Sequence, residues 1–162
     1  MAVMQAATGM LSDLDIALRL GVATIVGVAI GLNRDLHGKP TGIRTLGLVG
    51  LGSALVVLAA SDFGGSNDVN APSRAIQGVI TGIGFLGAGV ILKDAMTNQV
   101  HGLTTAASIW LTSCLGIVCG FGAWRTASIA LLITFVLLVF GGPIEKRLHA
   151  RFGDHPTKGP PA

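Results

Sequence analysis

The sequence predicts an all-α fold, a polytopic transmembrane helical bundle of about five spans. Of its 162 residues, 51% are hydrophobic, only 12% are charged, and a further 24 are glycine. A soluble domain of this length could not cover so much apolar surface. The apolar stretches are also continuous, whereas a transmembrane barrel would show alternating segments of about ten residues. The length allows one helical domain, because each crossing takes about 20 residues plus a connection.

Five long apolar windows mark the expected spans. They are approximately Ile16–Leu32, Thr45–Ala60, Ala75–Leu92, Leu103–Gly122 and Thr126–Gly142. The first window follows Asp13 and Asp15, and no Lys or Arg precedes Arg19. Because a cleaved signal peptide begins with a basic region, we expect this window to be a retained span.

Basic residues predict the orientation of the spans. Eight fall in the first loop, the third connection and the tail, and three fall on the other side. The eight are Arg34, Lys39, Arg44, Lys93, Lys146, Arg147, Arg151 and Lys158, and the three are Arg19, Arg74 and Arg125. The positive-inside bias therefore places the N-terminus outside and the C-terminus in the cytoplasm. We expect residues 1–143 to form the transmembrane domain and residues 144–162 a short basic cytoplasmic tail, partly disordered.

The remaining polar residue types give no sign of catalysis. Cys114 and Cys119 are five apart within one window, which matches neither CxxC nor a zinc site and indicates packing residues. The four histidines are scattered, although His101 beside Gly102 could serve a site. No nucleophile–base pair or phosphate loop is recognisable. The sequence therefore predicts no enzyme, no metal site and no cofactor, and its basic residues require no nucleic acid partner.

Glycines dominate the third window, "RAIQGVITGIGFLGAGVILKD", residues 74–94. A glycine weakens a helix in water, but in lipid it allows two helices to approach closely. Small-xxx-small pairs occur at Gly27/Gly31, Gly78/Gly82 and Gly116/Gly120, about as many as chance gives. The local density in the third window is more informative, because it places small surface on more than one helical face. It predicts a central helix that is contacted on several sides.

Two connections hold the most specific polar residues. In "HGLTTAASIW", residues 101–110, Thr104 or Thr105 is expected to cap a helix whose positive end could bind an anion or a partner's carboxylate. An ordinary cap is the simpler interpretation. In "GLNRDLHGKPTGIRT", residues 31–45, Arg34 with Asp35 is expected to mark the membrane edge, and Arg44 could hydrogen-bond to carbonyls or a neighbouring helix end.

Three blocks together resemble the MgtC/SapB family of bacterial inner-membrane proteins. They are "GLNRDLHGKPTGIRTLGLVGLGSAL", "PSRAIQGVITGIGFLGAGVIL" and "VHGLTTAASIWLTSCLGIVCGFG", in this order, and they cover most of residues 27–122. The resemblance implies a multi-pass inner-membrane protein linked to adaptation to low magnesium and, in pathogens, to virulence. It also implies other membrane proteins as partners, with the F-type ATP synthase or control of membrane potential as the target. A homodimer is a further possibility.

The resemblance also marks individual positions. These are Arg34, Pro40, Gly42, Arg44, Thr45, Ser73, Arg74, Gln77, Gly82–Gly89 and Gly102–Ala107. The chain departs from the family pattern at Asn33, Leu46 and Ala71, where the family commonly has an acidic residue, His and Asp, respectively. These departures put in doubt any cation-binding or acid–base role of those positions. Longer relatives carry a soluble domain after the last span, and here we expect the transmembrane domain only.

Two functional classes are favoured over an enzyme. The first is a regulator that contacts other membrane proteins through glycine-rich surfaces. The alternative is a transporter or channel for Mg²⁺ or another ion, although every acidic residue falls at or beyond a predicted span end. The candidate binding or functional residues are Arg34, Arg44, Thr45, Arg74, Gln77, Gly82, Gly84, Gly87, Gly89, His101, Thr104 and Thr105. Arg44 and Arg74 are predicted on opposite sides of the membrane, so one compact site would not hold both.

Overall fold

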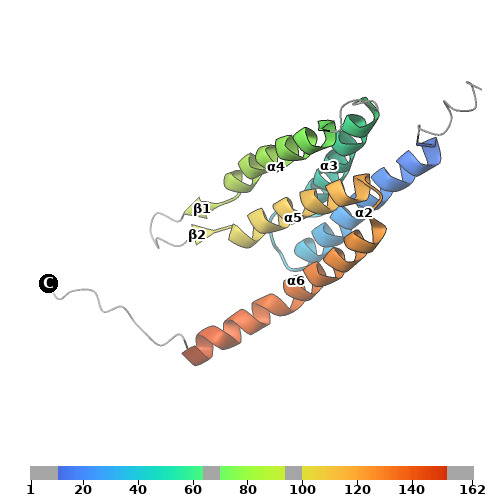
Figure 1. The fold of residues 1–162 in the computed structure, drawn as a ribbon. Helices are drawn as coiled ribbons and strands as arrows, with labels where there is room; N and C mark the ends of the chain where they lie inside the picture. Colours follow the sequence, from blue (N-terminus) through green and yellow to red (C-terminus); the bar gives the residue numbers. More distant parts are fainter. Residues whose placement is uncertain (1–10, 64–69, 94–99, 153–162) are drawn as a thin grey trace, which may run out of the picture. The chain divides into compact units, whose positions relative to one another are not determined.

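Five helices and one short hairpin make up the part of the chain that the computed structural model describes, residues 11–63, 70–93 and 100–152. In chain order they are α2 (Asp13–Leu36), α3 (Ile43–Phe63), α4 (Ala71–Gly89), β1 (Leu92–Lys93), β2 (Val100–His101), α5 (Leu103–Gly120) and α6 (Trp124–Phe152), as labelled in Figure 1. The chain separates into two compact units, Met1–Ala127 and Ser128–Ala162. The helical bundle that the sequence predicts is confirmed.

Each of the five predicted spans overlaps one helix, and the third, Ala75–Leu92, runs past the end of α4 into β1. Among the described helices, α2, α3, α5 and α6 are long and apolar enough to cross a membrane. Helix α4 is not among them, because Arg74, Gln77 and its glycines make it less apolar than the others. Its 19 residues still give a helix of about 28 Å, close to the thickness of the bilayer core.

Helix boundaries follow from local hydrogen bonds. Ser12 caps α2 by accepting a hydrogen bond from the Asp15 N–H at 3.2 Å. Between α2 and α3 the backbone turns through positive φ at Gly38 (60°) and Thr41 (61°). The Asp35 carboxylate then accepts a hydrogen bond from the Ile43 N–H at 3.0 Å, which satisfies one of the free donors at the start of α3.

Helices α3 and α5 form the centre of the first unit. Helix α3 packs against α2, α4 and α5, and α5 also packs against α2 and α4. Helix α4 lies at the side of this unit, and in it only Ile83 and Gly87 are buried. The prediction that the glycine-rich third window is central is therefore wrong.

Glycines in the other helices make the close approaches. A Cβ at Gly116 would lie 2.5 Å from the Gly50 carbonyl oxygen, and one at Gly31 would lie 2.7 Å from the Ile43 Cα. A Cβ at Gly27 would overlap the Leu46 carbonyl oxygen. Since no side chain fits at these positions, the Gly27/Gly31 pair binds α2 to α3, and Gly116 binds α5 to α3.

A short antiparallel hairpin connects α4 to α5. Leu92 pairs with His101 and Lys93 pairs with Val100. Gly102 then adopts φ of +92° as the N-cap residue of α5, without a side-chain cap hydrogen bond. The prediction that Thr104 or Thr105 caps this helix is wrong, because the helix already begins at Leu103.

The second unit consists of most of α6, which continues to Phe152 with Pro143 inside it. The helix thus extends past residue 143, where we placed the start of the tail. The Thr134 hydroxyl donates a hydrogen bond to the Ala130 carbonyl at 2.7 Å, which satisfies this polar group in an apolar helix. Residues 153–162, the second half of the predicted tail, lie outside the described residues.

Candidate functional site

Arg34 is the most unusual side chain of the first unit, because it is charged and only 3% exposed. It belongs to the last turn of α2, where a positive charge is favoured by the helix dipole. The neighbouring carboxylate of Asp35 does not pair with it and instead bonds the Ile43 N–H. Arg34 therefore holds a buried positive charge whose described hydrogen-bond partners are all neutral.

Carbonyl groups of the turn after α2 form one side of the Arg34 site. Nη2 donates to the Pro40 carbonyl at 2.9 Å, and Nε donates to the Pro40 and Thr41 carbonyls at 3.2 and 3.3 Å. The guanidinium is planar, so Nε and Nη2, which lie on the same edge, can both donate to this pair of carbonyls. Arg34 thereby fixes the turn that precedes α3.

Hydroxyl groups of α5 form the other side of the site. Nη2 donates to Thr105 Oγ1 at 2.6 Å and Nη1 donates to Ser108 Oγ at 3.0 Å. Thr105 and Ser108 are three residues apart and so share one face of α5. Because the two donors and the two acceptors come from different helices, this cluster joins α2, the following turn and α5 at one end of the unit.

Buried hydroxyls continue along α5 beyond the Arg34 site. Thr112 and Ser113 are fully buried. The Thr112 hydroxyl donates to the Ser108 carbonyl at 2.7 Å, and Ser113 lies 2.8 Å from the Ser53 hydroxyl of α3. Such back-bonding lets polar side chains remain in an apolar interior. These groups hold α5 against its neighbours and are all satisfied.

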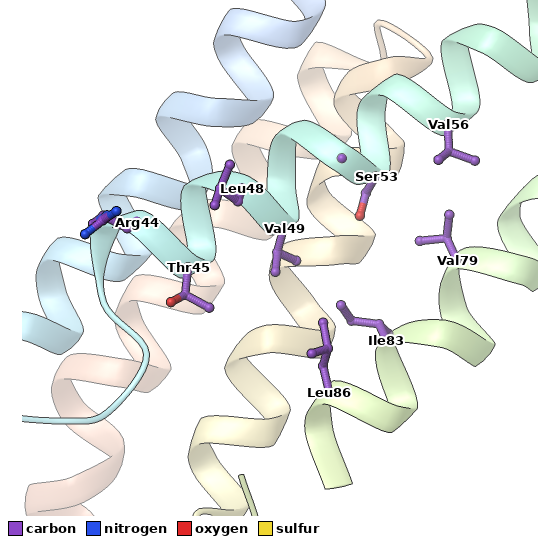
Figure 2. Close-up of a pocket in the computed structure, with 10 residues that line it drawn as sticks. Arg44, Thr45, Leu48, Val49, Ser53, Val56, Val79, Ile83 and Leu86 are labelled. Atoms are coloured by element: carbon purple, nitrogen blue, oxygen red, sulfur yellow. The ribbon is translucent and has the colours of Figure 1, made fainter. Parts of the chain in front are cut away.

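An open groove lies between α3 and α4. It is a cavity of about 740 Å³. Its lining residues are Arg44, Thr45, Leu48, Val49, Gly52, Ser53, Val56, Val79, Ile83 and Leu86. Figure 2 shows Val56 and Val79 facing each other at one end of the groove, and the lining residues of α4 end at Leu86, so no α4 side chain lines the end at Arg44. The groove is thus narrow and apolar at one end and wide and polar at the other.

Arg44 and Thr45 form the polar end of this groove. Both are exposed. Within the described part of the chain, neither the Arg44 guanidinium nor the Thr45 hydroxyl has a hydrogen bond or an ion pair. This differs from our expectation that Arg44 bonds carbonyls or a helix end, which is the role that Arg34 takes. The polar end therefore offers a cation and a hydroxyl to a ligand.

Helix α4 presents all of its glycines except Gly87 outward. A Cβ at Gly78, Gly82, Gly84 or Gly89 would meet nothing within 4 Å. We define the glycine face of α4 as Gly78, Gly82, Phe85 and Gly89, which follow each other at intervals of four, three and four residues and so lie on one side of the helix. All four are exposed, and Phe85 is 83% exposed.

The candidate residues from the sequence fall into separate groups. Arg34 and Thr105 meet, and Arg44 and Thr45 line one groove. Arg74 and Gln77 are exposed near the start of α4, at the opposite end from Arg44, as the predicted topology requires. Gly87 is buried with its Cβ position 3.7 Å from Ala106, and His101 is exposed on β2. The Thr104 side chain is exposed, and the Thr104 carbonyl accepts a hydrogen bond from the Ser108 hydroxyl at 2.8 Å.

Ser108 and the α4 side of the groove are functional candidates that the sequence does not predict. Ser108 could have been found, because it lies one helical turn beyond Thr105 on the same face. Val79, Ile83 and Leu86 gave no signal, since apolar residues at helical spacing are ordinary packing residues. In the described ranges, no group of three or more His, Cys, Asp or Glu side chains could hold a metal ion.

Comparison with known proteins finds one family model and several similar proteins. The model of the MgtC family matches residues 20–147. Protein SrpB of Synechococcus elongatus is 45% identical over 134 residues, which is 77% of this chain and 74% of SrpB. Protein SapB of Bacillus subtilis is 37% identical over 79% of this chain and 57% of SapB. The putative magnesium transporter YhiD of Escherichia coli is 39% identical over 75% of this chain and 58% of YhiD.

These matches cover the transmembrane part of the chain. Less than two thirds of SapB and of YhiD is matched, so the activities of those whole proteins do not transfer directly. No solved structure matches the chain. The matched residues contain the Arg34 site, the groove and the glycine face of α4, and they identify a multi-pass protein of the bacterial inner membrane.

Proposed function

Because this chain belongs to the MgtC family, we propose that it is a non-enzymatic regulator that binds transmembrane helices of other membrane proteins on the glycine face of α4. One observation carries this proposal. Gly27 and Gly31 of α2 and Gly116 and Gly120 of α5 have neighbouring backbone where a Cβ would lie, whereas Gly78, Gly82 and Gly89 of α4 have open space there. A helix with this surface exposed is suited to a partner that has not yet been bound.

The physics of the bilayer supports this assignment. Helices in lipid gain little from hydrophobic burial, so their association depends on close backbone approach and packing. Gly78 and Gly82 form a small-xxx-small pair that permits such an approach, and Phe85 offers a large side chain to fill the partner's surface. The F-type ATP synthase, which the family resemblance implies, is the first partner to test, and low magnesium is the condition.

Transport of Mg²⁺ is the second candidate, favoured by the printed name of the relative YhiD. Two features speak against it. Arg34 places an uncompensated positive charge in the packed interior, which repels a divalent cation. The segment Gly82–Gly89, where exposed backbone carbonyls could have formed a filter, is α-helical, so its carbonyls are directed along the helix.

The experiment compares two leucine substitutions on α4. Gly82→Leu fills the glycine face, and Gly84→Leu adds the same side chain on another side of the helix. Both positions have open space, so both variants should insert and fold. In a bacterium that lacks its own family member, we expect Gly82→Leu to lose support of growth under magnesium limitation and Gly84→Leu to retain it.

Two further measurements distinguish the candidates. ATP hydrolysis by inverted membrane vesicles should respond to the wild-type protein and to Gly84→Leu but not to Gly82→Leu. Purified protein in liposomes loaded with a magnesium-sensitive dye tests transport directly. Protein-dependent Mg²⁺ entry, together with full activity of Gly82→Leu in growth, would replace the regulator by the transporter.

A further inference from the structure

We infer that the groove between α3 and α4 is a binding site for an anionic phospholipid, with one acyl chain along the groove and the headgroup phosphate at Arg44. The evidence for this inference is separate from that for the proposed function, because it uses the side of α4 that carries Val79 and Ile83 and not the glycine face. It is carried by the length, the shape and the polarity of the groove.

The length of the groove matches one leaflet. Arg44 and Val56, at its two ends on α3, are twelve residues apart, which corresponds to about 18 Å along a helix. Half of the hydrocarbon core of a bilayer is about 15 Å thick. A chain that begins at the membrane edge beside Arg44 would therefore end near the midplane beside Val56 and Val79.

The shape of the groove favours an acyl chain over a helix. A peptide helix is about 10 Å wide along its whole length. Figure 2 shows the Val56 and Val79 side chains facing each other at one end of the groove, so a helix along the groove would have to displace them. An unbranched acyl chain is thinner and flexible, and it can follow the narrowing groove to its end.

The distribution of polar groups matches the two parts of a phospholipid. The narrow part is lined by Val56, Val79 and Ile83, and the Ser53 hydroxyl there is already paired with Ser113 at 2.8 Å. Methylene groups would therefore leave no polar group of the groove unsatisfied. The wide end carries Arg44 and Thr45, which have no partner among the described residues and can donate to phosphate oxygens.

The charge balance around the wide end is positive. Residues 34–44 contain Arg34, Lys39 and Arg44 against the single acid Asp35, whose carboxylate is bonded to the Ile43 N–H. A zwitterionic headgroup brings an ammonium group to this region, whereas a phosphatidylglycerol headgroup brings only the phosphate. The geometry thus selects an anionic lipid.

The first test measures lipid retention by native mass spectrometry of the detergent-purified protein. Dioleoyl phosphatidylglycerol and dioleoyl phosphatidylethanolamine are added at equal concentration. We expect one retained phosphatidylglycerol per chain and a retention about tenfold weaker in Arg44→Gln, since a hydrogen bond to a charged group is lost. Arg44→Lys should retain most of the binding, and Arg125→Gln, an exposed arginine remote in sequence, should be unchanged. Equal retention of the two lipids by the wild type, or unchanged retention by Arg44→Gln, would overturn the inference.

The second test maps the acyl chain. Gly52 lines the groove, and a Cβ there would meet nothing within 4 Å, so a leucine side chain at this position can extend into the groove. A phosphatidylglycerol with a photoreactive group at mid-chain should label the wild type on the peptides that contain Val56 and Val79. Labelling should be lost in Gly52→Leu and kept in the control Gly84→Leu. Unchanged labelling in Gly52→Leu, or cross-links at Val56 to a second copy of the chain in place of lipid, would refute the site.

Discussion

Replacement of the buried Arg34 by Met tests the structural reasoning most directly. The variant keeps an apolar side chain of similar length and removes every hydrogen bond of the guanidinium. Two acceptors keep other partners, because Ser108 still donates to the Thr104 carbonyl and Pro40 still accepts from the Thr41 hydroxyl. The change therefore leaves fewer unsatisfied groups than the number of lost bonds suggests.

The magnitude follows from the groups that lose their partner. These are the partly buried Thr41 carbonyl, which water can still reach in part, and the buried Thr105 hydroxyl. An unsatisfied buried polar group costs about 1–3 kcal/mol, and removal of a poorly solvated charge offsets part of this. We expect Arg34→Met to lower the free energy of unfolding by about 2–4 kcal/mol. Arg34→Lys should be at least as damaging, because an ammonium group keeps the buried charge but cannot serve acceptors on two sides as the fork does.

Thermal unfolding in detergent, followed by the reactivity of Cys119 towards a thiol dye, measures this effect. Cys119 is fully buried and becomes reactive on unfolding, and Cys114→Ala removes the half-buried second thiol. The Tm of Arg34→Met should fall by about 5–15 °C. The exposed Arg125→Met is the control and should stay close to the wild type. A Tm of Arg34→Lys equal to that of the wild type would show that the fork geometry is irrelevant and refute the reasoning.

Three further substitutions test other parts of the first unit in the same assay. Gly116→Ala should prevent stable folding, because its Cβ would lie 2.5 Å from a carbonyl oxygen of α3, whereas Gly78→Ala should leave the Tm unchanged or slightly raised; equal effects would contradict the assigned packing. Asp35→Ala should cost about 1 kcal/mol through loss of the acceptor for the Ile43 N–H, with Asp35→Asn intermediate, and no loss would show that α3 needs no cap there. Gly102→Ala combines a φ of +92° with overlap on a carbonyl of the preceding turn, so it should lower the Tm more than Gly78→Ala does.

The number and position of the helices could be predicted from the sequence because apolar windows of spanning length have one simple structural solution in lipid. The predicted window Thr45–Ala60 lies within α3, and Leu103–Gly122 begins where α5 begins. The basic-residue bias that orients the spans stays a prediction. It is consistent with Arg44 and Arg74 lying at opposite ends of the α3–α4 pair.

The roles of Arg34 and Arg44 could not be separated from the sequence. Both arginines flank the same turn next to an apolar window, so each could have been buried or exposed. The difference comes from α5, which brings Thr105 and Ser108 to Arg34 across more than seventy residues of chain. A contact at that separation leaves no local pattern, and a hydroxyl at helical spacing is too common to predict it.

The glycine density of the third window was interpreted correctly as small surface but assigned to the wrong place in the bundle. A glycine is compatible with a close contact that is already made and equally with one that is still open, and only the neighbours decide between them. Gly27, Gly31 and Gly116 have backbone of α3 against them, whereas Gly78 and Gly82 have open space. A high density of glycines thus indicates where another helix can approach closely. It does not indicate whether that helix belongs to the same chain.

The two proposed surfaces share α4 and therefore act on each other. The glycine face and the groove-lining residues occupy adjacent sides of this helix, as the spacing of Gly82 and Ile83 requires. Helix α4 is held by few buried residues of its own, Ile83 and Gly87, so its position depends on what fills the space beside it. A lipid chain against Ile83 would support α4 from the groove side and keep the glycine face presented to a partner. A leucine at Gly52 blocks the lipid chain but occupies only the part of the groove beside it, and it leaves the sequence of α4 unaltered. Loss of partner binding in Gly52→Leu would therefore arise from the missing lipid, whereas in Gly82→Leu it would arise from direct obstruction.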